Sequence, residues 1–287
     1  MRHSNLQIFQ SSDLQIHLPY ACILILFTIP KKGATFTRIF KEGMQKILSY
    51  PLSVLFYLAF GLVLVIFHPV QWLCFNVFGY HAHKRSVDVL NFFLVKTLLI
   101  LGSPVKFIGR EKLPEGVPLI IVANHQSMYD IPPIIWYMRK VHPKFISKKE
   151  LGKGIPSVSY NLRHGGSVLI DRKDPKQALP AIMGMARYIQ EHNRSAVIFP
   201  EGTRSKTGVP KKFSENGLKI LCKYAPSAYI VPVSINNSWK VVRFGSFPLG
   251  LGNRITFTIQ EPFAIKNIPF EEVAERTERE VIQGIKN

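Results

Sequence analysis

The stretch "PLIIVANHQSMYDIPP", Pro118 to Pro133, decides the fold class, because an uncharged apolar run ends there in a cluster of polar residues. A short, continuous apolar run without polar alternation is typical of a strand that is buried on both faces of a sheet. The pair of prolines that closes the stretch is tolerated in the first turn of a helix. We therefore expect a strand, then a turn that carries His125 and Asp130, and then a helix.

Apolar runs of this kind recur along the chain and alternate with amphipathic segments. Helical patterns are expected at 134–140, 178–192 and 214–224. Buried strands separated by helices predict an α/β fold, with a largely parallel sheet flanked by helices. Sites in such sheets gather beyond the carboxyl ends of the strands. The expected strands are 118–123, 144–147, 167–170, 195–200, 229–235 and 254–259.

The chain of 287 residues is strongly basic, with 37 Lys and Arg against 18 Asp and Glu and a formal charge of +19. This excess predicts an anionic partner: nucleic acid, an anionic membrane surface or a phosphorylated substrate. The basic residues are dispersed and form no aromatic-basic motif, so we do not expect nucleic acid. The cysteines, Cys22, Cys74 and Cys222, are scattered and predict neither a disulfide framework nor a metal site.

The N-terminal part carries the membrane signal. Residues 51–80 contain no charged side chain, and about 20 apolar residues suffice to cross a bilayer. We expect a membrane-embedded helical segment at 44–104, either spanning or entering and leaning, ahead of an α/β domain at 105–287. Residues 1–43 are interpreted as an upstream extension, with Met44 as an alternative start. His81 and His83, near basic residues, are interpreted as part of an interfacial patch.

His125 and Asp130 allow two interpretations. Five residues at 3.6 per turn place them about 140° apart, so the histidine belongs to the turn and not to one helix face. In the first interpretation Asp130 caps the following helix and His125 is an incidental loop residue. In the second, the carboxylate accepts a hydrogen bond from one imidazole nitrogen, which fixes the tautomer and leaves the other nitrogen free as a base.

A second polar cluster, "EGTRS" at 201–205, follows another expected strand. A glycine that frees the backbone, a hydroxyl and a guanidinium together suit a phosphate group, because arginine offers a planar fork to phosphate oxygens. A third strand, in "GGSVLIDRKD", ends at Asp171 and Arg172. Three strand ends with polar clusters, two of them carrying arginine, predict an anionic substrate held against the His–Asp pair.

These motifs resemble those of the glycerolipid acyltransferase family, in order and over most of residues 105–260. The NHxxxxD motif stands as Asn124, His125 and Asp130, and EGTRS is present letter for letter. "GGSVLIDR", "IVPVSI" and "ISKKEL" are similar to further family blocks. Leu169 departs from the aromatic residue that is common in the second block.

The resemblance implies acyl transfer from a thioester of coenzyme A or acyl carrier protein to the free sn-2 hydroxyl of 1-acylglycerol-3-phosphate (lysophosphatidate), which yields phosphatidate. It implies His125 as general base and Asp130 as its orienting partner. Glu201 would orient Arg204 or bind an acceptor hydroxyl. The implied phosphate-binding residues are Arg172, Glu201, Gly202, Thr203, Arg204 and Lys148.

The resemblance also implies a bilayer partner, an active site that faces the cytoplasm from the inner membrane, and no cofactor beyond the thioester co-substrate. Alternatives remain open at this point. The acceptor could instead be glycerol-3-phosphate, another lysophospholipid or a lyso-ornithine lipid. A catalytically silent lipid-surface protein of the same fold is the alternative outside enzymes.

Overall fold

The computed structural model describes residues 33–286, and the compact unit that holds the sheet begins at Gln45. Most of the expected extension at 1–43 lies outside the described residues. The helices are α2 (Gly33–Thr97), α3 (Ile131–Tyr137), α4 (Val158–His164), α5 (Pro175–His192), α6 (Glu215–Tyr224) and α7 (Phe270–Gln283). The strands are β1 (Val105–Ile108), β2 (Leu119–Ala123), β3 (Pro143–Lys148), β4 (Val168–Ile170), β5 (Ser195–Ile198), β6 (Tyr229–Asn236), β7 (Ile255–Ile259) and β8 (Phe263–Ala264).

The strands form one eight-stranded sheet in the order β1-β7-β6-β2-β5-β3-β4, with β8 beside β6. Strands β6, β2, β5, β3 and β4 run parallel, whereas β7 and β8 pair antiparallel with β6. The predicted fold class, an α/β fold with a largely parallel sheet, is confirmed. The parallel arrangement brings the carboxyl ends of β2, β5, β6, β3 and β4 to one edge of the sheet.

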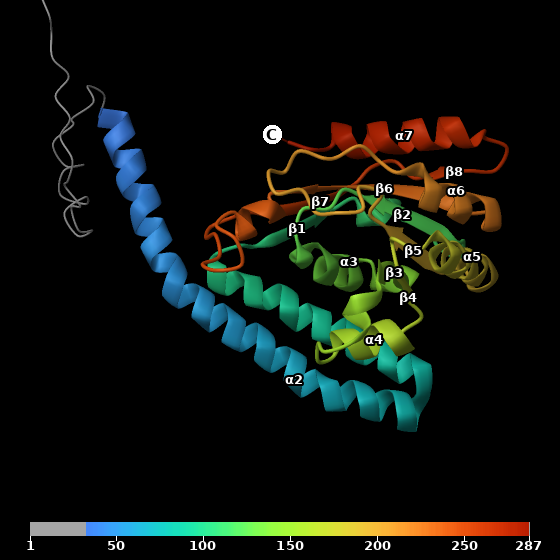
Figure 1. Ribbon diagram of the computed structural model, residues 1–287, viewed down its shortest axis with the longest axis horizontal. Helices are drawn as coiled ribbons and strands as arrows, with labels where there is room; N and C mark the ends of the chain where they lie inside the picture. The colour runs from blue at the N-terminus through green and yellow to red at the C-terminus, as the bar shows by residue number, and fades with distance from the viewer. Residues whose placement is uncertain (1–32, 287) are drawn as a thin grey trace, which may run out of the picture. The chain divides into compact units, whose positions relative to one another are not determined.

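Each face of the sheet is covered by different helices (Figure 1). Strand β2 shows the division, because its side chains alternate between two apolar clusters. Leu119 and Ile121 pack with α3 and α2, while Ile120 and Val122 pack with α5, α6 and α7. All five residues of β2 are fully buried, which explains the uninterrupted apolar run that marks this strand in the sequence.

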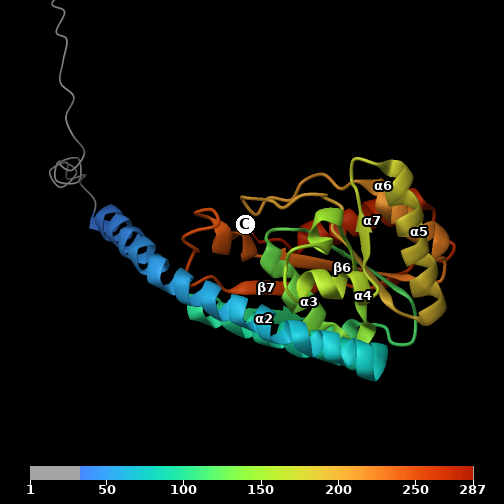
Figure 2. The same ribbon diagram turned by 60° about the horizontal axis from the view of Figure 1, so that its bottom comes forward.

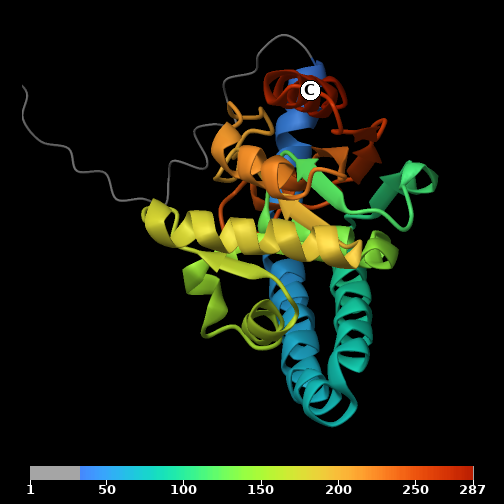
Figure 3. The same ribbon diagram turned by 90° about the vertical axis from the view of Figure 1, so that its right-hand side faces the viewer.

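The helix α2 consists of two helices that meet at Gly79, whose φ of 77° is left-handed and requires no Cβ. From Gln45 onward, the two helices form a hairpin that lies along the α/β unit (Figures 2 and 3). Leu64 on the first helix packs against Leu90 and Leu94 on the second. Near the start of the hairpin, Phe56 packs edge-on against Tyr129 of the α/β unit, with ring centroids 5.5 Å apart.

The outer face of the hairpin is apolar and exposed. The segment Gly43–Leu101 is, by length and composition, able to cross a membrane, and only 17% of its most apolar window is buried. Side chains at least half exposed on its first helix include Leu55, Leu58, Leu62, Val65, Ile66 and Trp72. The interfacial interpretation of His83 is wrong, because the structure buries this side chain completely between the hairpin and the α/β unit.

Candidate active site

The structure brings His125 and Asp130 together in the turn after β2. His125 Nδ1 lies 2.8 Å from Asp130 Oδ2, and the imidazole is slightly exposed while the carboxylate is fully buried. Within the described residues, Nε2 of His125 makes no hydrogen bond. The arrangement leaves this nitrogen available to a substrate hydroxyl.

The carboxylate of Asp130 is held by donors from the turn itself. Its Oδ2 accepts hydrogen bonds from the backbone amides of Gln126 at 2.7 Å and Ser127 at 2.9 Å, in addition to the imidazole. Its Oδ1 accepts a hydrogen bond from the hydroxyl of Ser238. Burying a carboxylate without such partners would be costly, and these donors offset that cost. Although Asp130 directly precedes α3, its side chain does not cap that helix, so the capping interpretation is wrong.

Phe199 and Glu201, which follow β5, hold His125 from the other side. The Phe199 and imidazole rings stack at 4.2 Å between centroids. Glu201 accepts hydrogen bonds from the backbone amides of His125 at 2.7 Å and Lys211 at 2.9 Å. Burial raises the pKa of the Glu201 carboxyl, and the two amides oppose this effect. Glu201 thus positions the histidine loop, and neither of its oxygens binds Arg204.

Arg172, Gly202 and Thr203 form a polar rim beside this pair. Gly202 has a φ of 68°, and an added Cβ would meet nothing within 4 Å. The Arg172 guanidinium donates a hydrogen bond to the Gly202 carbonyl, which joins the end of β4 to the end of β5. Lys211 donates to the Thr203 hydroxyl. Two cations therefore lie along the rim.

Arg204 and Lys148 lie at the exposed edge of this rim. Both side chains are exposed, and neither forms an ion pair within the described residues. Lys148 is the last residue of β3, next to β5 in the sheet. Their cationic groups are free to meet an anion that approaches from solvent.

Sequence reasoning missed Ser238 and Gln126. The Gln126 side-chain oxygen accepts hydrogen bonds from the amides of Ser238 at 3.0 Å and Trp239 at 3.5 Å. Asn124 forms a two-bond pair with the backbone of Ile235, at 2.7 and 2.9 Å. These contacts tie the His–Asp turn to the end of β6. The only sequence pattern that pointed to Ser238 is the polar "NNS" at 236–238, directly after "IVPVSI".

Cys222 is not part of the site. It lies on α6 and packs against the cluster formed by α5, α6 and α7. Burial raises the pKa of its thiol to about 12, so the nucleophilic thiolate is scarce near neutral pH. Cys222 is therefore a packing residue of this helix.

The residues that build this site also relate the chain to known proteins. The acyltransferase family model matches residues 104–236. The chain is 38% identical to the 1-acyl-sn-glycerol-3-phosphate acyltransferase of Helicobacter pylori, over 45% of this chain and 52% of that one. It is 27% identical to the protein of the same name from Saccharomyces cerevisiae, over 74% and 64%. The chain thus spans about half to two thirds of the length of these two relatives.

A solved structure extends the likeness to most of the chain. The crystal structure of the 1-acyl-sn-glycerophosphate (LPA) acyltransferase PlsC from Thermotoga maritima matches with a TM-score of 0.69 and 26% identity, over 84% of this chain and 95% of that one. The family match covers the His–Asp turn and the EGTRS block, and the structural match covers the fold that positions them. Residues 104–236 thus match an acyltransferase domain, and the chain is similar in sequence and in fold to 1-acyl-sn-glycerol-3-phosphate acyltransferases.

Proposed function

We propose that this protein transfers a fatty acyl group from a thioester to the sn-2 hydroxyl of 1-acylglycerol-3-phosphate, forming phosphatidate. The observation that carries the proposal is the His125–Asp130 pair at 2.8 Å, with Nε2 unoccupied by other described residues and a cationic rim beside it. The relatives that the chain matches bear the name of this activity, which supports the proposal.

The chemistry requires a base, because an alcohol is a poor nucleophile at neutral pH. Nε2 of His125 accepts the proton of the acceptor hydroxyl as its oxygen attacks the thioester carbonyl. The buried Asp130 carboxylate stabilises the imidazolium that forms. When the tetrahedral intermediate collapses, the C–S bond breaks and the imidazolium returns the proton to the leaving thiolate. The products are an ester and a free thiol, without an acyl-enzyme.

The cationic rim suits the phosphate of the acceptor. Arg172 and Arg204 supply guanidinium groups, Gly202 lets the backbone approach, and Thr203 and Lys148 are further donors. Coenzyme A and acyl carrier protein are both anionic, so a basic surface suits either donor. No resident cofactor or metal is part of the proposed reaction.

The proposal is tested by acyl transfer with the full chain purified in detergent. Labelled lysophosphatidate is offered with coenzyme A and carrier-protein thioesters, and monoacylglycerol serves as the acceptor without phosphate. We expect phosphatidate with at least one donor and roughly 10²-fold lower kcat/KM for monoacylglycerol, because one charged contact is worth several kcal/mol when desolvated. Glycerol-3-phosphate and other lysolipids are offered as acceptors in parallel assays. Preference for one of them would assign a different acceptor, and no transfer to any would refute the proposal.

Ser238 is expected to support the reaction through Asp130. Ser238→Ala removes the hydroxyl that donates to Oδ1 but leaves the Ser238 amide on Gln126, so we expect about a tenfold lower kcat with little change in KM. Ser238→Thr should keep the rate. Ser234→Ala is the matched control, because this equally buried serine donates to the Val281 carbonyl away from the site. Equal activity of Ser238→Ala and Ser234→Ala would contradict the role.

We also propose that the hairpin lies in the membrane and that the active site faces the cytoplasm, where thioester donors are made. Both helices of the hairpin pack against the α/β unit, through Phe56 and Val87. This packing favours a hairpin that enters one leaflet of the bilayer without crossing it. Leu58→Glu combined with Leu62→Glu is expected to lower the membrane-bound fraction about tenfold or more, because both side chains are exposed on the apolar face. Leu179→Glu, at an exposed apolar position on α5, is the control. Unchanged membrane binding of the double variant would contradict this placement.

A further inference from the structure

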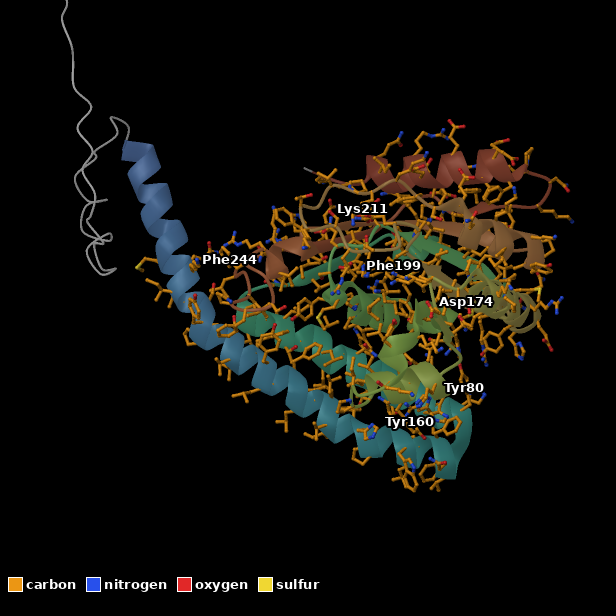
Figure 4. All side chains as sticks on the ribbon, viewed as in Figure 1. Tyr80, Tyr160, Asp174, Phe199, Lys211 and Phe244 are labelled. Carbon is orange, nitrogen blue, oxygen red and sulfur yellow. The ribbon has the colours of Figure 1, made fainter. Side chains whose placement is uncertain are left out.

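A pocket outside the proposed active site lies between the turn of the hairpin and the start of β3. Lys144, its central cation, is the second residue of β3 and pairs with Ala196 near the start of β5. It thus lies at the amino ends of β3 and β5, whereas Lys148 and Glu201 of the candidate active site lie at or beyond the carboxyl ends of these strands. Figure 4 shows Tyr80 beside the hairpin turn and Phe199 farther up, beside the sheet. The polar residues that line it are Tyr80, His83, Lys84, Asp88, His142, Lys144, Asn161 and Ser167.

The pocket holds buried donors that lack acceptors. His83 is fully buried, and neither of its ring nitrogens has a hydrogen-bond partner in the described part of the chain. The same holds for the hydroxyl of Tyr80 and for Nδ1 of His142. Lys144 is 6% exposed, and its ammonium forms no hydrogen bond or ion pair with residues 43–286. Folded proteins rarely leave buried polar groups without a hydrogen-bond partner, so these groups indicate that a ligand binds in the pocket.

The charges of the pocket are also unbalanced. Among the described residues, the only carboxylate that lines it, Asp88, already pairs with Lys84 at 2.6 Å. Lys144 and Arg194 instead lie against the same ring, that of Tyr80, at 5.1 and 4.6 Å from its centroid. Burial, together with repulsion from Arg194 and Lys84, lowers the pKa of Lys144 to about 7. The positive potential is therefore not neutralised by the protein itself.

We propose that this pocket binds a phosphate group, as a small tetrahedral oxyanion held by Lys144, His83 and Tyr80. All three side chains can donate, and an oxyanion accepts from several directions at once. In this pocket, the volume that the centre of a water-sized sphere can occupy is about 20 Å³, which leaves room for a small tetrahedral oxyanion and excludes a larger organic ligand. The ligand is either free phosphate or the headgroup of a phosphomonoester lipid. Two of its donors come from the hairpin and one from β3, so the bound anion would stabilise the packing of the hairpin against the sheet.

The test measures thermal unfolding of the full chain in detergent, without any catalytic readout. Inorganic phosphate is titrated at constant ionic strength against chloride, and micelles doped with phosphatidate form the lipid arm. We expect a saturable rise in Tm of about 3 °C at roughly ten times the Kd in phosphate or in the lipid arm, and none in chloride. A response to the lipid alone would identify the headgroup as the source.

Variants separate this pocket from the active site. In inorganic phosphate, Arg204→Gln, in the active-site rim, and Lys149→Met, an exposed lysine beyond the carboxyl end of β3, should keep the rise, whereas Lys144→Met should lose it. In the lipid arm, Lys144→Met should lose only the part of the rise that Arg204→Gln keeps, because the proposed active site also binds phosphatidate as its product. His83→Gln is the second variant, in case Lys144→Met does not fold, and should weaken the Kd about tenfold. Without phosphate, Lys144→Met should be at least as stable as the unsubstituted chain, because it removes a buried, unneutralised charge.

Three results would overturn the proposal: no saturable rise in either arm, a rise that persists unchanged in Lys144→Met or in His83→Gln, or a rise that disappears in Arg204→Gln. The last would assign the anion to the active-site rim. Because the readout is stability, a failure of the proposed acyl transfer would leave this result unaffected, and the reverse also holds.

Discussion

His125→Ala is expected to lower kcat for acyl transfer by about 10²–10⁴-fold, the usual contribution of a positioned general base. The reason is geometric. Nε2 is the one ring nitrogen not engaged by Asp130, and Phe199 stacks on the ring and fixes its plane. Alanine leaves Asp130 and the cationic rim in place, so binding of the acceptor phosphate should change little and KM should stay within a few-fold.

The variant should also fold, which keeps the measurement interpretable. The hydrogen bond from His125 to Glu201 comes from the backbone amide and survives the substitution. The matched control is His192→Ala, a more exposed histidine at the end of α5. Initial rates with lysophosphatidate, together with Tm, check the expectation. If His125→Ala kept full activity and an unchanged Tm, His125 would not be the general base.

The positions of the reacting groups were predictable from sequence because each follows an apolar run. A strand buried on both faces has no polar residue until it ends, and His125 and Glu201 both stand just beyond such an end. Arg172 follows the short apolar strand β4, which is only partly buried. The parallel direction of β2, β4 and β5 then makes their convergence a consequence of topology. The partly exposed strand β1 and the two-residue β8 lack the uninterrupted run and were missed.

What could not be predicted depends on which strands become neighbours. Ser238 and Asp130 are 108 residues apart, and they meet because β6 lies directly beside β2 in the sheet. The partners of Glu201 were likewise not predictable from the sequence. Its residue type suggested a partner for Arg204 or for substrate, while the fold gives both its oxygens to backbone amides. The helix α7 was also missed, although Val273, Thr277 and Val281 recur at a spacing of four residues.

Asp130→Asn separates the charge of the aspartate from its orienting role. In this turn the amides of Gln126 and Ser127 both donate to Oδ2, so an asparagine places its carbonyl oxygen there and its amide nitrogen toward Ser238. The carbonyl oxygen still accepts from Nδ1 of His125 and keeps the same tautomer. Only the negative charge that stabilises the imidazolium is lost.

We therefore expect Asp130→Asn to lower kcat roughly 10²–10³-fold while KM and Tm change little, because a hydrogen bond to a charged partner exceeds its neutral equivalent by a few kcal/mol. Asp130→Ala should lose at least as much activity and also unfold at a lower temperature, since it leaves two buried amides without an acceptor. The comparison of the two variants by steady-state kinetics and thermal unfolding decides between charge and orientation. If Asp130→Asn kept most of its kcat while Asp130→Ala lost it, the carboxylate would act through orientation alone, and the stabilisation of the imidazolium would have to come from the stacked ring of Phe199 or from the substrate.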